Sequence, residues 1–451
     1  MSSKSKREKC LYDFKIKLKP HQIKAVKYLM QPNTNGLLVT HPTGWGKSIT
    51  AVAFAGCFLE KYKDSKIIIV GPVSVTKAFE DYVNDLGLDI DRIEIYSYQK
   101  FANLFEEGKI NCQGNGMIID EVHNLRNLGT FSYLNESDRS SFSDREKKES
   151  GIRAKTILEC TSGCKKRMIL TATPFVNELK DFIPLINFIY GGHLIYKKNQ
   201  LKNIDDLDKY LNKKIYFIPP NFKTSDNFPT YKEEYIKIKM PKSYEKDYCS
   251  LIRGQIVNKA GFKNPNSFYN AHRRAVNKIG RSQEYFSLKI KKTISLIGDY
   301  KTVIFSNWLE YGVEPICKEL ATNKISYQIF VGSFSEKKRN KIIKDFNNDH
   351  YQVLVLSGSG KEGIDLKKVR RLIVMDPVWN FAGMEQIRGR AIRYQSHIDL
   401  PPSQRNVSIY YLLLITDKKD CLSGDSVVYG FIEEKKKLQV LIDKKLKKLS
   451  I

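Results

Sequence analysis

Two series of short apolar runs constrain the fold of this 451-residue chain more than any other feature. One series lies in the N-terminal part of the chain and the other in the C-terminal part. Runs that are apolar at nearly every position are typical of strands covered on both faces, as in a parallel sheet flanked by helices. The sequence therefore predicts an α/β fold with two parallel-sheet lobes in tandem. The runs of the first series are residues 36–40, 66–72, 93–98, 116–121 and 167–174, and those of the second are residues 302–306, 327–333, 352–358, 371–376 and 407–415.

The stretch 193–292 lacks this rhythm and mixes tyrosine and phenylalanine with lysine. It holds 22 lysine and arginine residues against 9 acidic ones. The resulting net charge of +13 is nearly half of the chain's net charge of +27. We expect a basic, mixed insertion between the lobes. The expected domains are lobe 1 at residues 1–192, the insertion at 193–292, lobe 2 at 293–418 and a basic amphipathic helix at 419–451.

The C-terminal helix is predicted from five apolar residues spaced along one helical face. Helices of this kind commonly dock on their own domain, and binding of a partner or a nucleic acid is the alternative. The five residues are Leu438, Leu441, Ile442, Leu446 and Leu449.

The charge balance points to a polyanionic partner. The chain has 76 lysine and arginine residues against 49 acidic ones, and such an excess costs self-repulsion in the compact state. We expect a nucleic acid as the partner. A general bias toward lysine codons is the alternative explanation.

The 8 cysteines are scattered, and no pair of CxxC segments brings four ligands together. The sequence therefore predicts neither a zinc site nor a disulfide framework. Cys160 and Cys164 lie one helical turn apart and are expected to pack in the core. The charged start and the absence of a long apolar run favour a protein of a reducing, cytoplasmic compartment with no membrane partner.

The segment HPTGWGKS at residues 41–48 lies between an apolar run and an apolar helical pattern. Such loops bind nucleotides because backbone N–H groups at a helix N-terminus surround the phosphate oxygens. Lys47 is expected to reach the β- and γ-phosphates, and Ser48 to ligate magnesium. His41 departs from the usual pattern, since it stands at the position of the first glycine. The other residues of the expected ATP-binding loop are Pro42, Thr43, Gly44, Trp45 and Gly46.

Two carboxylates, Asp120 and Glu121, follow the apolar run GMII. This places them at the C-terminal edge of a strand, where open α/β sheets bind ligands. Asp120 is expected to bind magnesium, and Glu121 to orient and deprotonate the attacking water. An ordinary acidic strand end is the alternative, which the upstream phosphate loop disfavours. His123 is expected to link this site to the facing lobe.

The segment QIRGRAIR at residues 386–393 contains a pair of arginines. Arg390 and Arg393 lie three residues apart, so on a helix both point the same way. A positioned arginine stabilises charge on the γ-phosphate and supplies a rate factor of roughly 10³ to 10⁵. We expect this pair to be catalytic, and a solvated basic face is the alternative.

Together these segments resemble superfamily 2 helicase-like ATPases. More narrowly, the chain is similar to the Swi/Snf-related branch of large cytoplasmic DNA viruses, which includes poxvirus nucleoside triphosphatase I and the ATPase subunit of the early transcription factor. The resemblance covers roughly residues 15–416 and includes LKPHQIKAV, LTATPFVNE, SGSGKEGIDL and DPVWNF. It implies two RecA-like lobes that share one ATP and hold nucleic acid across both.

The resemblance also implies roles for residues outside the three main segments. Gln22 is expected to contact the adenine base, and Gly71 and Pro72 the nucleic-acid backbone. Gly363 and Asp365 are expected to lie near ATP in lobe 2. The residues expected to couple hydrolysis to strand movement, beside His123, are Thr171, Ala172, Thr173 and Gln386.

Within the basic insertion, four cationic residues are expected to bind phosphates, with nearby aromatic rings available for stacking. A surface that packs on its own aromatic residues is the alternative. The four residues are Arg273, Arg274, Lys278 and Arg281.

The sequence thus favours an ATP-dependent nucleic-acid translocase or helicase that uses Mg·ATP and grips phosphates rather than base edges. DNA is favoured over RNA as the track, in viral transcription or genome handling, and the host cytoplasm or the virion is the expected location. The alternative is a transcription initiation or termination factor whose ATPase remodels a polymerase complex without unwinding duplexes. Its partners would be RNA polymerase or transcription factor subunits.

Overall fold

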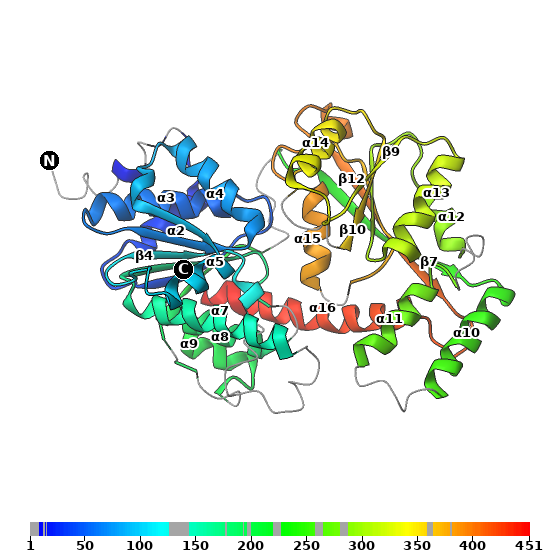
Figure 1. Ribbon diagram of the computed structural model, residues 1–451, viewed down its shortest axis with the longest axis horizontal. Helices are drawn as coiled ribbons and strands as arrows, with labels where there is room; N and C mark the ends of the chain where they lie inside the picture. The colour runs from blue at the N-terminus through cyan, green and yellow to red at the C-terminus, as the bar shows by residue number, and fades with distance from the viewer. Residues whose placement is uncertain are drawn as a thin grey trace. The chain divides into compact units, whose positions relative to one another are not determined.

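The computed structural model of the protein describes most of the chain, and the statements below refer to that part. The chain divides into two compact units, each of which is described by itself (Figure 1). Unit 1 consists of Met1–Phe222 and Leu438–Ile451, and unit 2 of Lys223–Lys437. The described residues are 9–11, 14, 16–125, 144–175, 178–192, 194–195, 200–219, 227–257, 265–279, 287–358, 364–378 and 381–451.

Unit 1 contains a six-stranded sheet in the order β3-β2-β4-β5-β1-β6, with every pairing parallel. The five strands expected from the first series of apolar runs are all present. The sixth, β6, lies in the stretch expected to be an insertion. The strands are β1 (Gly36–Thr40), β2 (Ile67–Gly71), β3 (Ile93–Ser97), β4 (Gly116–Ile119), β5 (Lys166–Thr171) and β6 (Ile215–Phe217).

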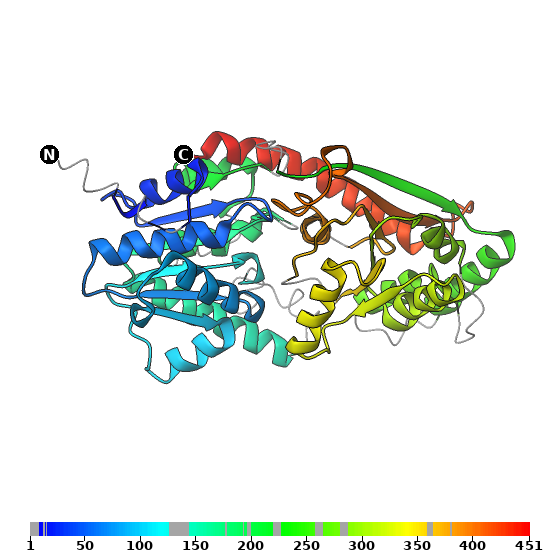
Figure 2. The same ribbon diagram turned by 90° about the horizontal axis from the view of Figure 1, so that it is seen from above.

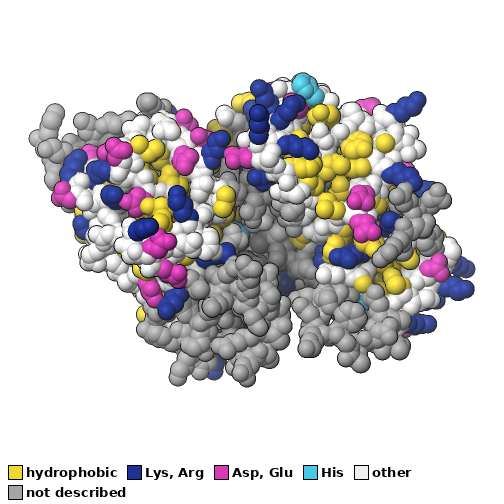
Figure 3. All heavy atoms as spheres, in the orientation of Figure 1, with side chains coloured by type: hydrophobic (Ala, Val, Ile, Leu, Met, Phe, Trp, Pro, Cys, Tyr) yellow, Lys and Arg dark blue, Asp and Glu magenta, His cyan; other side chains and the backbone are white. Residues whose placement is uncertain are grey.

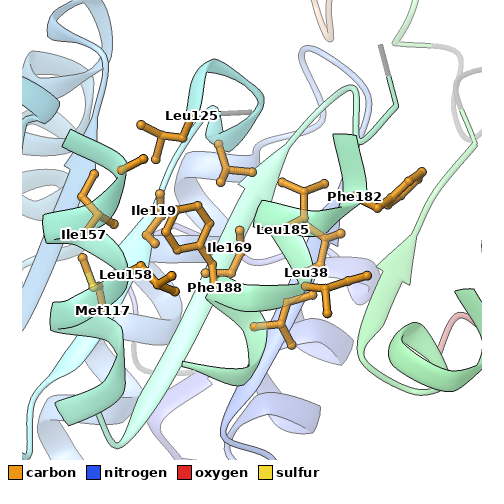
Figure 4. Close-up of a cluster of buried hydrophobic side chains, with 14 of the residues drawn as sticks. Leu38, Met117, Ile119, Leu125, Ile157, Leu158, Ile169, Phe182, Leu185 and Phe188 are labelled. Atoms are coloured by element: carbon orange, nitrogen blue, oxygen red, sulfur yellow. The ribbon is translucent and has the colours of Figure 1, made fainter. Parts of the chain in front are cut away.

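Helices cover both faces of this sheet, which explains why its strands are apolar at successive positions (Figure 1). On one face, α7 (Asp144–Gly163) and α8 (Phe182–Tyr190) pack on alternate strand residues in a large apolar cluster (Figure 4). Ile119 and Ile169 point from the strands toward Phe188 of α8. On the other face lies α3 (Lys47–Lys61).

Unit 2 contains a second six-stranded parallel sheet in the order β7-β12-β11-β8-β10-β9. Five of its strands correspond to the second series of apolar runs, and β7 was not expected. Figure 2 shows β7, in green, along the edge of this sheet. The strands are β7 (Thr230–Lys239), β8 (Thr302–Ser306), β9 (Tyr327–Phe330), β10 (Val353–Ser357), β11 (Arg371–Val374) and β12 (Asn406–Ile415).

Alternate residues of these strands enter two different cores. Val303 and Phe305 face a cluster that includes residues of α14 (Glu336–Asn347) and α15 (Phe381–Ala391). Ile304 between them faces a second cluster with α12 (Leu288–Ser295) and α13 (Glu314–Thr322). The remaining α-helices are α2 (Pro20–Leu29), α4 (Val73–Leu86), α5 (Tyr98–Glu106), α9 (Leu207–Leu211), α10 (Lys242–Val257), α11 (Pro265–Ala275) and α16 (Gly424–Leu449).

These two sheets confirm the predicted α/β fold with two parallel-sheet lobes. The boundaries differ from the expected ones, because the stretch 193–292 is divided between the units rather than forming a body of its own. Strand β6 completes the sheet of unit 1, and β7 pairs along its whole length with β12 in unit 2.

The C-terminal helix also differs from its expected extent. Helix α16 begins at Gly424, and its last turns bury Ile442, Leu446 and Leu449 in the core of unit 1. Leu441, expected on the same face, is exposed. Docking on the chain's own core therefore accounts for most of the predicted apolar stripe.

Three disulfide bonds correct the expectation that the chain has no disulfide framework. They join Cys10 to Cys57, Cys112 to Cys160, and Cys249 to Cys421, with Cα–Cα distances of 5.2, 5.3 and 5.9 Å. Each bond lies within one unit. The partners are 47, 48 and 172 residues apart, so only the fold brings them together.

The two remaining cysteines, Cys164 and Cys317, are free and buried. Burial raises the pKa of the Cys164 thiol to about 12, and its sulfur donates to the carbonyl oxygen of Cys160 at 3.2 Å. Cys164 thus packs in the core, as expected. In the described part of the chain, no helix combines the length and the apolar character needed to cross a membrane.

We expect the paired change Cys249→Ser and Cys421→Ser to lower the free energy of unfolding by about 3–5 kcal/mol, because it releases a long closed loop in the unfolded chain. Denaturant titration of the oxidised protein measures the loss. Cys317→Ala, which removes a free buried thiol and leaves the three crosslinks in place, is the control, and reductant should lower its unfolding midpoint as it lowers that of the native protein. A native protein whose unfolding midpoint is insensitive to reductant would contradict these bonds.

Candidate active site

The loop between β1 and α3 has the backbone of an anion-binding turn. Gly44 and Gly46 have φ angles of 82° and 75°, a left-handed conformation that glycine adopts without strain. The amide of Trp45 donates to the carbonyl oxygen of Pro42 at 3.2 Å, which closes the turn. Helix α3 begins at Lys47 with no acidic residue in its first turn, so its free N–H groups present positive potential.

The start of helix α2 holds this loop in place. The side-chain amide of Gln22 donates to the carbonyl oxygen of Gly46 at 3.2 Å and accepts from the backbone N–H of Lys19 at 2.8 Å. A Cβ atom on Gly46 would lie 2.5 Å from the Gln22 amide nitrogen, so a side chain there would displace the Gln22 amide from the loop. The structure places Gln22 against the loop, and its contact with adenine stays a prediction.

His41 gives the first position of the loop a role in packing. Its side chain is fully buried, and its ring lies 5.0 Å from that of His21 and 5.4 Å from that of Tyr216. Burial lowers the pKa of His41 well below its usual value, with a further contribution from the charges of His21 and Lys47, so the ring is neutral. Among the described residues, its ring nitrogens have no hydrogen-bond partner. The Lys47 amine donates to the His41 carbonyl oxygen at 3.4 Å.

The predicted acidic pair lies at the same edge of the sheet as the loop. Asp120 directly follows β4 and is buried, and one of its carboxylate oxygens accepts from the backbone N–H of Glu121 at 2.8 Å. Burial and the neighbouring Glu121 charge raise the pKa of Asp120 to about 7, and the nearby Lys47 amine opposes this rise. Lys47 and Asp120, 73 positions apart in the sequence, therefore sense each other's charge.

Glu121 is held in a strained backbone conformation. Its φ angle is 48°, which a non-glycine residue adopts at a cost of about 1–3 kcal/mol when the surroundings enforce it. The hydroxyl of Tyr98 donates to the carbonyl oxygens of both Asp120 and Glu121, at 3.1 Å in the second case. Tyr98 is a site residue that the sequence reasoning missed, because nothing in its position as the first residue of α5 signalled this contact.

His123 connects the acidic pair to the segment Thr171–Ala172–Thr173. Its Nδ1 atom lies 3.2 Å from a carboxylate oxygen of Glu121 and 3.2 Å from the Thr171 hydroxyl. The same hydroxyl accepts from the backbone N–H of Thr173 at 3.1 Å. The carboxylate and the end of β5 are thus joined through one imidazole.

In unit 2, the predicted arginine pair contacts one short segment. Arg390 is buried and donates to the carbonyl oxygen of Ile364 at 3.5 Å, while Arg393 lies 3.5 Å from the Asp365 carboxylate. Helix α15 ends at Ala391, so only Arg390 of the pair is helical, in contrast to the prediction.

Two further residues were predicted for this region of unit 2, Gln386 and Gly363. Gln386 lies on α15 and is partly buried. Gly363 falls outside the described residues, so its predicted place near ATP stays a prediction.

The residues predicted to bind nucleic acid in the insertion separate into two groups. Arg273 and Lys278 are buried, and Arg273 donates to the carbonyl oxygen of Pro377 at 2.9 Å, so neither is available to a phosphate in this structure. Arg274 is exposed, and its guanidinium lies over the ring of Trp308 at 4.8 Å. Arg281 lies outside the described residues.

Gly71 and Pro72 lie where the sequence placed them, at the end of β2 and the start of α4. A Cβ atom on Gly71 would come within 2.8 Å of Val75, so the chain turns tightly here. Gly71 is buried and Pro72 half-buried. Their contact with a nucleic-acid backbone stays a prediction.

Comparison with known proteins agrees with this geometry. The chain matches the SNF2-related domain over residues 21–297 and the helicase conserved C-terminal domain over residues 288–395. The first match contains the phosphate loop and the acidic pair, and the second contains the arginine pair.

Two viral relatives align along nearly the whole chain. The protein named "Putative ATP-dependent RNA helicase L538" of Acanthamoeba polyphaga mimivirus is 28% identical over 95% of this chain and 97% of its own length. Nucleoside triphosphatase I of Heliothis armigera entomopoxvirus is 24% identical over 93% of this chain and 76% of its own length.

The helicase domain of Pyrococcus furiosus Hef has a similar fold, with a TM-score of 0.50 and 16% identity over 91% of this chain and 97% of that one. The resemblance to poxvirus nucleoside triphosphatase I and the two-lobed fold are confirmed by these matches. Since the first domain match alone spans more than half of the chain, the protein belongs to the SNF2-related family and is an ATP-hydrolysing enzyme.

Proposed function

We propose that the protein couples the hydrolysis of Mg·ATP to movement along a nucleic acid, with DNA favoured over RNA as the track. The observation that carries this proposal is the juxtaposition of Lys47 and Asp120 at one edge of the sheet in unit 1. A cationic side chain on an anion-binding helix terminus and a buried carboxylate are the two groups that a magnesium nucleotide requires.

Magnesium suits the oxygen atoms present here. Magnesium ions are usually bound through one or two carboxylates together with substrate phosphates and waters. Ser48, in the first turn of α3, and Asp120 supply such hard oxygen donors. Among the described residues there is no group of three or more histidine, cysteine or acidic side chains able to hold a metal ion, so phosphate oxygens would complete the coordination.

Hydrolysis requires a base beside the γ-phosphate. Glu121 directly follows Asp120, the proposed magnesium ligand. Its backbone is fixed by the positive φ angle and by the hydrogen bond from Tyr98, so its carboxylate has an orientation of its own. It would accept a proton from the attacking water. Arg390 and Arg393 of unit 2 would stabilise the charge that develops on the transferred phosphoryl group, on the premise that both units share one nucleotide.

Coupling to movement would use the contact between His123 and Thr171. A change at the Glu121 carboxylate during hydrolysis alters the hydrogen bonds of His123, and through Thr171 those of Thr173. This chain of contacts links three of the predicted coupling residues, His123, Thr171 and Thr173.

Surface charge supports a polyanionic track. Figure 3 shows lysine and arginine side chains gathered over α14 in unit 2. The exposed lysines of this helix are Lys337, Lys338, Lys341 and Lys344. Arg274 adds an exposed guanidinium over an aromatic ring, which suits both phosphate contact and base stacking.

A role in a polymerase complex, without strand separation, differs from this proposal in a measurable way. ATPase rates with single-stranded DNA, duplex DNA, single-stranded RNA and no nucleic acid identify the track, and release of a labelled strand from a duplex reports unwinding. Stimulation without strand release, together with copurification of polymerase subunits, would favour the polymerase role. A rate equal in all four conditions would reject the motor.

We expect Glu121→Gln to lower kcat at least about 100-fold, since a general base contributes roughly 10² to 10⁴ to the rate. Lys47→Ala should abolish turnover by removing the phosphate contact. Phosphate release measures both. Glu60→Gln, an exposed change near the end of α3, is the control with native activity. Native turnover in either site variant would refute the assigned site.

Tyr98→Phe should weaken hydrolysis while leaving nucleotide binding intact, because it removes the hydroxyl that holds the backbone of Asp120 and Glu121. An unsatisfied buried acceptor costs about 1–3 kcal/mol, so we expect kcat to fall roughly 5- to 100-fold. Tyr96→Phe is a matched control, since its hydroxyl donates to Glu94 at 3.2 Å, away from the site. Equal kinetics of the two variants would contradict the role of Tyr98.

Nucleic-acid binding should weaken steeply with salt, and Arg274→Ala should reduce the slope of log K against log salt by about 1. Fluorescence anisotropy with a labelled oligonucleotide measures both. Arg253→Ala, an exposed arginine paired with Asp420 in the same unit, is the control. An unchanged slope for Arg274→Ala would exclude this arginine from the phosphate contacts.

A further inference from the structure

The first described residues of unit 2 pack against α15, which carries Arg390, and against the residues that follow Arg393. The chain passes between the units at two places, before Lys223 and within α16. At the first of these, β6 belongs to the sheet of unit 1, and β7 is the edge strand of the sheet of unit 2. We call residues 227–235, which include the first half of β7, the connector strap.

The N-terminal end of the strap contacts the residues that follow α15. The backbone N–H of Gln395 donates to the carbonyl oxygen of Asn227 at 2.8 Å, and the Asn227 side-chain amide donates to the Tyr394 hydroxyl at 3.3 Å. The rings of Phe228 and Tyr394 lie 5.7 Å apart. This end of the strap therefore fixes the turn directly after Arg393.

A second contact holds α15 itself. The guanidinium of Arg388 lies 3.2 Å from the Glu233 carboxylate and also donates to Glu385. It lies over the ring of Tyr231, with 4.9 Å to the ring centre. Only 12% of the Arg388 side chain is exposed.

The Glu233 carboxylate is fixed in its turn by sheet residues. It accepts from the Tyr411 hydroxyl of β12 at 3.1 Å, and the Tyr411 ring stacks on Tyr235 at 4.7 Å. The Arg388 guanidinium is thus paired with a carboxylate that is itself held in place at the sheet edge. Such a pair differs from an ion pair in solvent, which contributes little to stability.

The two contacts lie on either side of the arginine pair in the sequence. Arg388 precedes Arg390 by two residues, which places them on opposite sides of α15, one toward β7 and the other toward Ile364. A rotation or shift of α15 that moves Arg390 must therefore also disturb the pair of Arg388 and Glu233.

We propose that the connector strap sets the position of the arginine pair, with Glu233 and Arg388 as positioning residues for ATP hydrolysis. This inference rests on the proposed function, in which Arg390 and Arg393 act on the γ-phosphate. In the sequence, the strap follows one of the two passages between the units.

The test measures kcat, KM for ATP and binding of a nonhydrolysable ATP analogue for Glu233→Gln and Arg388→Gln in the full chain. We expect each variant to lower kcat roughly 10- to 100-fold, because misplacing a catalytic group by about 1 Å has effects of this size. KM and analogue binding should stay within about twofold, since the phosphate loop lies in unit 1. The double variant should lose no more than either single variant.

A matched control exists in the same unit. Lys301 also has a mostly buried side chain, pairs with Asp349 at 2.6 Å and lies over the ring of Phe346 at 4.6 Å, without contact to α15 in any described interaction. Asp349→Asn should keep native kcat. Thermal unfolding of each variant identifies loss of folded protein. If Glu233→Gln does not fold, Asn227→Ala takes its place as a milder change in the strap, and we expect it to lower kcat severalfold.

Two outcomes would overturn the inference: native kcat in folded Glu233→Gln and Arg388→Gln proteins, or an equal loss in Asp349→Asn. Arg388→Lys should recover part of the rate, since it restores the charge without the forked geometry. Loss of activity in Glu121→Gln with native activity in the strap variants would leave the proposed function intact and refute the strap alone. Native activity in both would refute the proposed site as well.

Discussion

The alignment of parallel strand ends is the constraint on which the rest of this protein depends. In the order β4-β5-β1, Ile119 pairs with Ile169, and Thr40 with Thr171. Every segment that leaves these strands at their carboxyl ends therefore starts at the same edge. The phosphate loop, the acidic pair and the threonine segment meet there because the hydrophobic effect aligns the strands, although more than 40 residues separate each from the next.

Much of the fold and of the nucleotide site could be predicted from the sequence, since both leave local signals. Most of the ten predicted strands are apolar at nearly every position because helices cover both faces of each sheet. The loop before α3 has two residues with positive φ, and both are glycine. The spacing of Gly44, Gly46 and Lys47 in the sequence therefore predicts the loop. Asp120 and Glu121 follow a buried strand directly, so their place at the sheet edge follows from chain order.

The remaining features depend on contacts between distant residues. Strand β7 lies at a sheet edge and mixes charged residues with tyrosine and isoleucine. It therefore lacks the continuous apolar run of a strand buried on both faces, and the sequence analysis assigned it to the insertion. Arg273 looked like a surface cation, yet burial against Pro377 makes it structural. The disulfide between Cys249 and Cys421, and the hold of Tyr98 on the acidic pair, likewise have no local signature.

The docking of α16 has a consequence for the order of folding. Ile442, Leu446 and Leu449 complete the apolar core of unit 1, and the backbone N–H of Lys213 donates to the carbonyl oxygen of Leu449 at 3.0 Å. Unit 1 therefore cannot close its core until the ribosome has made residues 438–451, after all of unit 2 has been synthesised. The core of the unit translated first is thus completed after the second unit has been made, and its apolar surface stays open while unit 2 is synthesised.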